Sequence, residues 1–246
     1  MPITRAHVKE NERNKKLYKQ EFWTRYEKSD LKASDCQYFL AFRLTSNDKL
    51  LHNLRIVQDE YVAKDSSLCS MLEPLEKKAH IPLNIIRCDE TRLDELKKLI
   101  SETVEKHKEK LANPPEMEVK ALVIEYSDPY PYHPISVYAR FRNKSLLRCD
   151  ESWFFDFQDL FEDILNKNGF ETFYHSLSER ITLFRRKSGH KFEVERKCIR
   201  PYAKTVFGEL TMRELSSLHL CSMKSSAQES EDGFYHIEQT FDLNFK

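Results

Sequence analysis

The stretch at 80–88, "HIPLNIIRC", opens with a histidine and continues as an apolar run, which predicts a β-strand. Successive side chains of a strand point to opposite faces, so His80 and Pro82 are expected to share a face. A second stretch of the same form, "RITL", stands at 180–183 and also follows a predicted helix and a polar connection. The recurrence predicts an internal duplication of two lobes.

The remaining hydrophobic patterns predict an α+β fold, because strands and helices alternate irregularly rather than as repeated βαβ units. Gly169 follows one helical pattern and is expected to end that helix. Further strands are predicted at 38–45, 118–126, 135–141, 216–223 and 234–245, and helices at 47–65, 91–111, 156–170 and 199–207.

Composition narrows the classes of function. Lys plus Arg and Asp plus Glu both number 40 in the 246 residues, so any affinity for nucleic acid must be local. The 6 cysteines are scattered singly without a CxxC pair, so we expect no metal site and no cofactor. They read as reduced thiols of a cytoplasmic or nuclear protein. No apolar run approaches the roughly 20 residues of a membrane span, so no membrane partner is expected.

Residues 1–35 are predicted to be a basic N-terminal extension, followed by a single domain at 36–246. The extension contains an aromatic cluster at helical spacing, which predicts a short amphipathic helix. This helix is expected to dock on the domain; the alternative is a partner-binding or nuclear-targeting segment. The domain itself is expected to be monomeric. The cluster comprises Leu17, Tyr18, Phe22, Trp23 and Tyr26.

Several segments, taken in chain order, resemble one known family. They are "YFLAFRLT" (38–45), "LRIVQDEYVAKD" (54–65), "HIPL", "RITL", and a tail in which "LCSM" (220–223) precedes "GFYH" (233–236). Together they are similar to the phosphoesterase-like domain of A-kinase anchor protein seven, a branch of the two-histidine (2H) phosphoesterase superfamily. The resemblance implies a two-lobed, RNA ligase T-like fold with two sheets facing a central cleft. It also implies metal-independent chemistry on 2′,3′-cyclic phosphates or 2′,5′-linked oligonucleotides.

The family's strands each carry His-x-Thr or His-x-Ser, and this sequence keeps half of each motif. His80 matches the first histidine, but Pro82 replaces the hydroxyl; Thr182 matches the second hydroxyl, but Arg180 replaces the histidine. A guanidinium stays protonated and cannot act as a base, although its fork of donors binds phosphate well. The resemblance therefore implies a degenerate site with His80 as a catalytic remnant, Thr182 as a retained hydroxyl and Arg180 as a phosphate ligand.

Strand parity suggests two further ligand-binding residues. Arg186 and Phe184 have the same parity as Arg180 and Thr182, so a regular strand would turn them into the cleft. Arg186 would then contact phosphate and Phe184 would stack on a base. For Arg186 the alternative is a solvated strand end. Other aromatic residues that could stack are Tyr38, Phe42, Tyr130 and Tyr132.

The leading hypothesis is a catalytically degenerate protein that binds a nucleotide or an RNA 3′-terminus through phosphate, or acts as an interaction module. The loss of one of two acid–base groups weighs against normal catalysis, since each contributes about 10²–10⁴-fold. One alternative is an active 2′,5′- or cyclic phosphodiesterase that uses His80 alone. The other is a scaffold that anchors a signalling protein partner.

Overall fold

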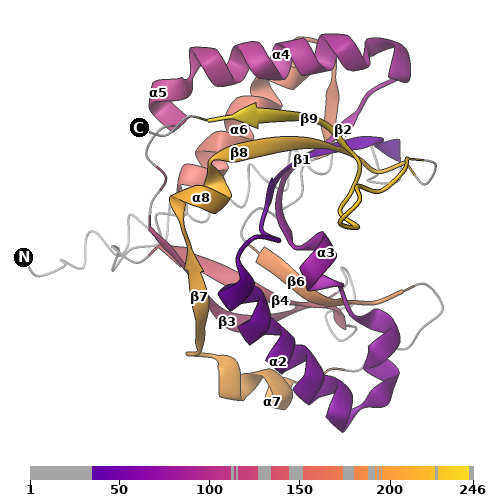
Figure 1. Ribbon diagram of the computed structural model, residues 1–246, viewed down its shortest axis with the longest axis vertical. Helices are drawn as coiled ribbons and strands as arrows, with labels where there is room; N and C mark the ends of the chain where they lie inside the picture. Colours follow the sequence, from indigo (N-terminus) through magenta and orange to yellow (C-terminus); the bar gives the residue numbers. More distant parts are fainter. Residues whose placement is uncertain are drawn as a thin grey trace, which may run out of the picture. The chain divides into compact units, whose positions relative to one another are not determined.

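The strands form two antiparallel sheets in the computed structural model of the chain (Figure 1). Sheet A has the order β5-β2-β1-β8-β9 and sheet B has the order β6-β4-β3-β7. Sheet A contains β1 (Tyr38–Arg43), β2 (His80–Arg87), β5 (Glu171–Phe173), β8 (Ser217–Ser222) and β9 (Ile237–Asp242). Sheet B contains β3 (Met117–Tyr126), β4 (Pro134–Asn143), β6 (Arg180–Arg185) and β7 (Val206–Leu210). The structure describes residues 35–111, 114, 116–126, 134–143, 152–173, 180–187, 192, 194, 196–224 and 227–243.

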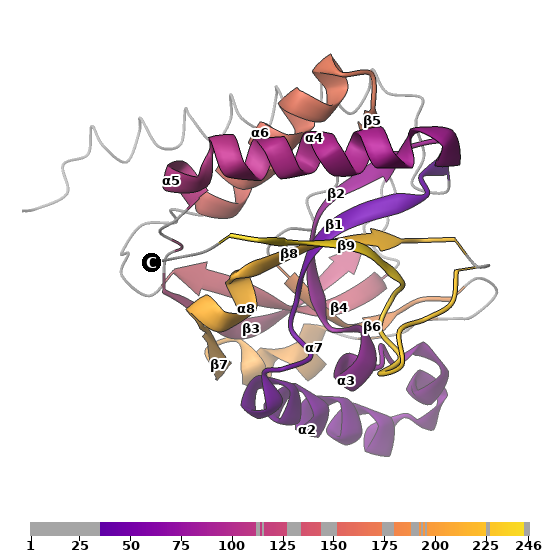
Figure 2. The same ribbon diagram turned by 45° about the horizontal axis from the view of Figure 1, so that its top comes forward.

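Two long helices pack against sheet A. Helix α4 (Leu93–Lys106) buries Leu96, Ile100 and Val104, which recur at helical spacing, and contacts β9. Helix α6 (Ser152–Lys167) contacts β2 and α4. Gly169 follows α6 with a φ of 76°, a left-handed conformation that glycine adopts without steric cost. Figures 1 and 2 show both helices on the same side of sheet A.

Helix α2 (Asp48–Lys64) packs against sheet B, with Leu54, Val57 and Tyr61 among its buried residues. Its N-terminus is capped by the side chain of Asn47, which accepts from the backbone N–H of Leu50 at 3.2 Å. The two sheets with their helices confirm the expected α+β architecture of two lobes. None of the helices in the described part of the chain is long and apolar enough to cross a bilayer.

Both motif strands contain a β-bulge immediately after the motif. In β2, Pro82 pairs with Ala41 but the next pair joins Ile85 to Phe39, so β2 carries one extra residue. In β6, Thr182 pairs with Tyr138 but Phe184 pairs with Val137, so Leu183 is the extra residue. A bulge reverses the face on which later side chains lie. Simple strand parity therefore holds through Pro82 and Thr182 and fails beyond them.

Gln58 of α2 fixes the second bulge in place. Its buried amide Nε2 donates to the carbonyl of Leu183 at 2.8 Å and to the carbonyl of Glu73 at 2.9 Å. The backbone N–H of Glu73 donates to the same Leu183 carbonyl at 2.9 Å. These bonds satisfy buried carbonyls that the sheet ladder leaves free. They also tie β6 to the segment that leads into β2.

The sequence prediction of a helix at 199–207 is wrong. The structure has a short helix, α7 (Arg196–Ile199), a 3₁₀ turn, η4 (Arg200–Tyr202), and then the strand β7. Pro201 sits at the start of the 3₁₀ turn, and Val206–Leu210 pairs with β3 as an edge strand. The other short elements are η2 (Ser66–Met71), α3 (Leu75–Lys78), η3 (Glu90–Arg92), α5 (Lys108–Leu111) and α8 (Met212–Leu215). The predicted N-terminal helix lies outside the described residues.

Candidate functional site

One pocket brings together the residues of the two motifs. His80 and Pro82 of β2 line it from sheet A, and Arg180 and Thr182 of β6 line it from sheet B. Its cavity volume is about 30 Å³. Because one water needs roughly 10–15 Å³ on this measure, the pocket is small, with room for about two waters. The other lining residues are Glu73, Leu75, Lys78, Ala79, Ile181 and Arg185.

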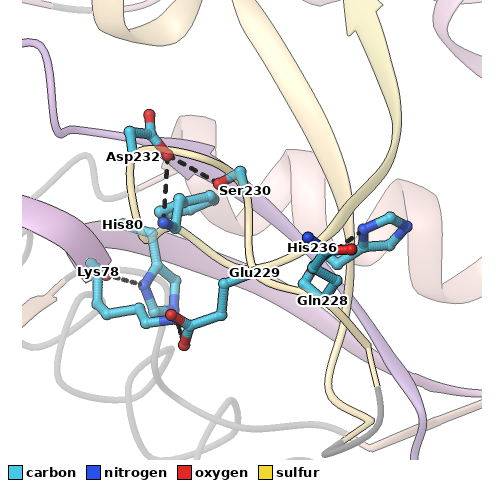
Figure 3. Close-up of polar contacts among 8 residues, drawn as sticks. Lys78, His80, Gln228, Glu229, Ser230, Asp232 and His236 are labelled. Carbon is cyan, nitrogen blue, oxygen red and sulfur yellow. Dashed lines mark hydrogen bonds and ion pairs between the residues drawn. The ribbon is translucent and has the colours of Figure 1, made fainter.

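His80 is half-buried and held in one tautomer. Its ring Nδ1 lies 2.6 Å from the backbone carbonyl of Lys78, which can only accept, so Nδ1 carries the proton and Nε2 carries a lone pair (Figure 3). The ring packs among Phe39, Phe234 and Tyr235 at centroid distances of 5.3–6.3 Å. Burial lowers the pKa of His80 to about 4, and the nearby positive charges act in the same direction. His80 is therefore a neutral imidazole, a potential base and not an acid, near pH 7.

The lowered pKa predicts that His80 will not titrate between pH 8 and 5. The ring's proton NMR signals are expected to shift with a midpoint near pH 4 rather than near 6.5. The pKa of His80 is lower in the folded state than in the unfolded state. The free energy of unfolding should therefore decrease as the pH falls from about 6.5 toward 4, and His80 should not affect it above that window. A His80→Gln variant assigns the signal and removes this part of the pH dependence. A midpoint above 6 would contradict the assignment of a desolvated ring.

Pro82 is accommodated by the local strand geometry. It pairs with Ala41 on β1, next to the β2 bulge, while the other neighbour, β5, pairs only with the later residues Ile85–Arg87. A proline is tolerated in a sheet at such a bulge or on an unpaired side. No carbonyl of a neighbouring strand there needs the N–H that proline lacks. The pocket thus has an apolar ring at the position where the resemblance implies a hydroxyl.

Arg180 is buried and already paired. Its side chain is 8% exposed, and Nη1 lies 2.8 Å from Oε2 of Glu125, which also accepts from the hydroxyl of Ser136 at 2.6 Å. Its guanidinium carbon lies 4.8 Å from the centroid of the Tyr138 ring. The buried Nε–H has no acceptor among the residues that the structure describes. Arg180 is therefore fixed in orientation and retains an unused donor.

Thr182 lies on the same strand face as Arg180. Thr182 pairs with Tyr138 of β4, and Arg180 pairs with Arg140. The two pairs are therefore two residues apart on each strand. The side chain is half-buried and lines the pocket. Within the described ranges, no hydrogen bond of its hydroxyl to another protein group occurs, so that hydroxyl can donate to or accept from a ligand.

The bulge corrects two predicted site residues. Phe184 is fully buried and faces the opposite side of sheet B, where its ring lies 5.7 Å from that of Tyr61, so it cannot stack on a base in the pocket. Arg186 follows the end of β6, is exposed and does not line the pocket. Arg185 takes its place, because one extra residue turns position 185 to the pocket face.

The other candidate aromatic residues do not contribute either. Tyr38 and Phe42 have no exposed surface, and their side chains belong to the main hydrophobic core. Tyr130 and Tyr132 lie outside the described residues. Lys78 and Glu73 were missed by the sequence analysis, and strand parity with His80 could not have indicated Lys78, because that residue ends helix α3.

Each cation of the pocket is matched by a carboxylate from a distant part of the chain. Arg180 pairs with Glu125, Arg185 Nε lies 3.1 Å from Glu73, and Lys78 Nζ lies 2.6 Å from Glu229. The site therefore combines a neutral imidazole, a hydroxyl and three cations whose charges are already balanced. No group of three or more His, Cys, Asp and Glu side chains that could hold a metal ion occurs in the described parts of the chain.

Comparisons with known proteins identify the family. A search of curated protein sequences gives no match to the chain. Among solved structures, the crystal structure of TT0787 from Thermus thermophilus is similar, with a TM-score of 0.48 and 15% sequence identity over 84% of this chain and 97% of that chain. A family profile described as the AKAP7 2'5' RNA ligase-like domain matches residues 36–243. The chain therefore belongs to the AKAP7 2'5' RNA ligase-like domain family, within the 2H phosphoesterases.

Proposed function

We propose that this protein recognises a phosphate group of a nucleotide or an RNA terminus and does not catalyse phosphodiester transfer at the rate of a complete 2H site. The observation that carries the proposal is the convergence of His80, Thr182 and Arg180 on one pocket. Arg180 and Thr182 supply N–H and O–H donors for phosphate oxygens, and Lys78 and Arg185 line the same pocket as cations that are paired with carboxylates.

The chemistry of the site weighs against catalysis. Phosphodiester cleavage by general acid–base catalysis needs one group to take a proton and another to give one to the leaving oxygen. His80 can take a proton at Nε2, but Arg180 keeps its proton at any physiological pH. Pro82 removes one donor to the phosphate oxygens, and such a donor contributes about 3 kcal/mol in comparable sites.

A second candidate function is slow phosphodiesterase activity with His80 as the sole base. The Lys78 carbonyl fixes the imidazole with its lone pair on Nε2, the protonation state that a base requires. Arg180 would then stabilise the charge on the phosphate oxygens. This alternative predicts turnover that disappears in a His80→Ala variant.

The proposal is tested by titration and by a turnover assay on the same protein. Inorganic phosphate and adenosine 2′,3′-cyclic phosphate are expected to bind, and a Thr182→Val variant is expected to bind roughly tenfold more weakly, because an isosteric change removes one hydrogen bond to a charged group. Thr91→Val, at an exposed position in η3, is the matched control and should not change affinity.

The turnover arm separates the functions. No cleavage of the cyclic phosphate or of 2′,5′-oligoadenylate is expected. Cleavage that His80→Ala abolishes would replace the binding proposal with the phosphodiesterase. An absence of both binding and turnover would leave an interaction module or a scaffold for a protein partner.

A further inference from the structure

An acidic connection between β8 and β9 lies beside His80. We call residues 227–236 of this connection the strap. Its tight turn is closed by the Gly233 N–H donating to the Ser230 carbonyl at 2.7 Å, with Gly233 at a φ of 79°. Asp232 accepts from the Ser230 hydroxyl at 2.7 Å, and Phe234 is fully buried. The strap is therefore a folded part of the domain with a defined position over sheet A.

Two ion pairs join the strap to strand β1 of sheet A and to helix α3, which precedes β2. Asp232 pairs with Arg43, whose guanidinium lies 4.6 Å from the centroid of the Phe234 ring. Glu229 pairs with Lys78, whose ammonium lies 4.2 Å from the centroid of the Tyr235 ring (Figure 3). Of the two cations only Lys78 lines the pocket.

The Lys78–Glu229 pair joins a half-buried cation to an exposed anion. The Lys78 side chain is 16% exposed, whereas that of Glu229 is 61% exposed. Lys78 holds the pKa of Glu229 below its usual range, so the carboxylate is charged at neutral pH. The ammonium is kept in place by the Tyr235 ring, but the carboxylate can turn into solvent. A second anion at the pocket would compete with Glu229 for the same ammonium.

We propose that Glu229 is a specificity-determining residue of the pocket: it occupies Lys78 as an internal competitor and so restricts the negative charge that the pocket accepts. This inference rests on the proposed phosphate-binding function. With Glu229 in place, Lys78 contributes little net attraction, and Arg180 and Arg185 are balanced by Glu125 and Glu73 in the same way. Glu229 differs from those two carboxylates in lying on a surface connection rather than on a strand or in the pocket wall.

The test compares Glu229→Gln with Glu231→Gln in the 246-residue chain, using inorganic phosphate as the probe. Both variants remove one negative charge from the strap, but Glu231 is exposed and makes no ion pair within the described residues. Glu229→Gln is expected to bind phosphate about two- to tenfold more tightly, the range for the loss of a partly exposed competing ion pair. Glu231→Gln is expected to match the wild type. The rate of acylation of Lys78, read by mass spectrometry, should rise in Glu229→Gln alone.

The outcomes distinguish this inference from the function on which it rests. If the wild type binds phosphate and the two variants behave alike, Glu229 is not a competitor while the binding function stands. If phosphate binds to Glu229→Gln but not to the wild type, both are supported, and the strap dominates the affinity. If phosphate binds to none of the three proteins, the proposed function fails and the role of Glu229 fails with it.

Discussion

An Arg180→Met variant is expected to lose about 2 kcal/mol of unfolding free energy and to bind phosphate at least tenfold more weakly. Removing one partner of a buried ion pair costs about 3–5 kcal/mol. The smaller figure applies here because Glu125 is 23% exposed and keeps the hydrogen bond from Ser136. Methionine fills much of the volume of the arginine stem, so the loss reports the charge rather than a cavity.

The two effects are separated by adding Glu125→Gln to Arg180→Met. The double variant removes both charges, so it should recover most of the lost stability in a urea titration while phosphate binding stays weak. If binding returned together with stability, Arg180 would act only by holding Glu125 in place. If Arg180→Met bound phosphate as the wild type does, the pocket would not be a phosphate site built on Arg180.

The sequence was sufficient to predict the strands that carry the site. The short runs "HIPL" and "RITL" each place two side chains on one strand face, and both pairs line the same pocket in the structure. Period-2 alternation over three residues is a local property, so it can be read without knowledge of the partner strand. The family resemblance added the expectation that the two strands face each other.

The errors arose where the structure depends on residues distant in sequence. The β6 bulge is held by Gln58 and by the segment around Glu73, which lie more than a hundred positions earlier in the chain. No local sequence pattern at position 183 predicts the bulge. Parity therefore assigned Phe184 and Arg186 in place of Arg185. Likewise, the carboxylates that balance the pocket come from β3 and from the strap, which the sequence does not connect with 80 or 180.

Restoring the two lost groups is expected to create phosphodiesterase activity. A Pro82→Thr and Arg180→His double variant would place a hydroxyl and an imidazole where the resemblance implies them. Position 82 tolerates the change because it pairs with Ala41 at the bulge and has no β5 partner. A histidine at 180 would project toward the region of Glu125, and a nearby carboxylate raises the pKa of an imidazole.

These environments assign opposite roles to the two histidines of the double variant. His80, with its pKa lowered to about 4, is neutral and takes the proton, while the new imidazole beside Glu125 is protonated and gives one to the leaving oxygen. Turnover of adenosine 2′,3′-cyclic phosphate should rise to at least about 100-fold above the detection limit set by the wild type, the lower end of the contribution of one acid–base group. Arg180→His alone should give less, because Pro82 still withholds a donor to the phosphate oxygens.

The role of His80 in the gained activity has its own control. Adding His80→Ala to the double variant should abolish the gain, because His80 is the neutral base of the pocket and Glu73, the carboxylate that also lines it, is paired with Arg185. A folded double variant that binds the cyclic phosphate but does not cleave it would show that strand substitutions alone do not restore the distance between acid and base. That result would indicate that the replacement of histidine by Arg180 is associated with a different spacing between sheet A and sheet B at the pocket.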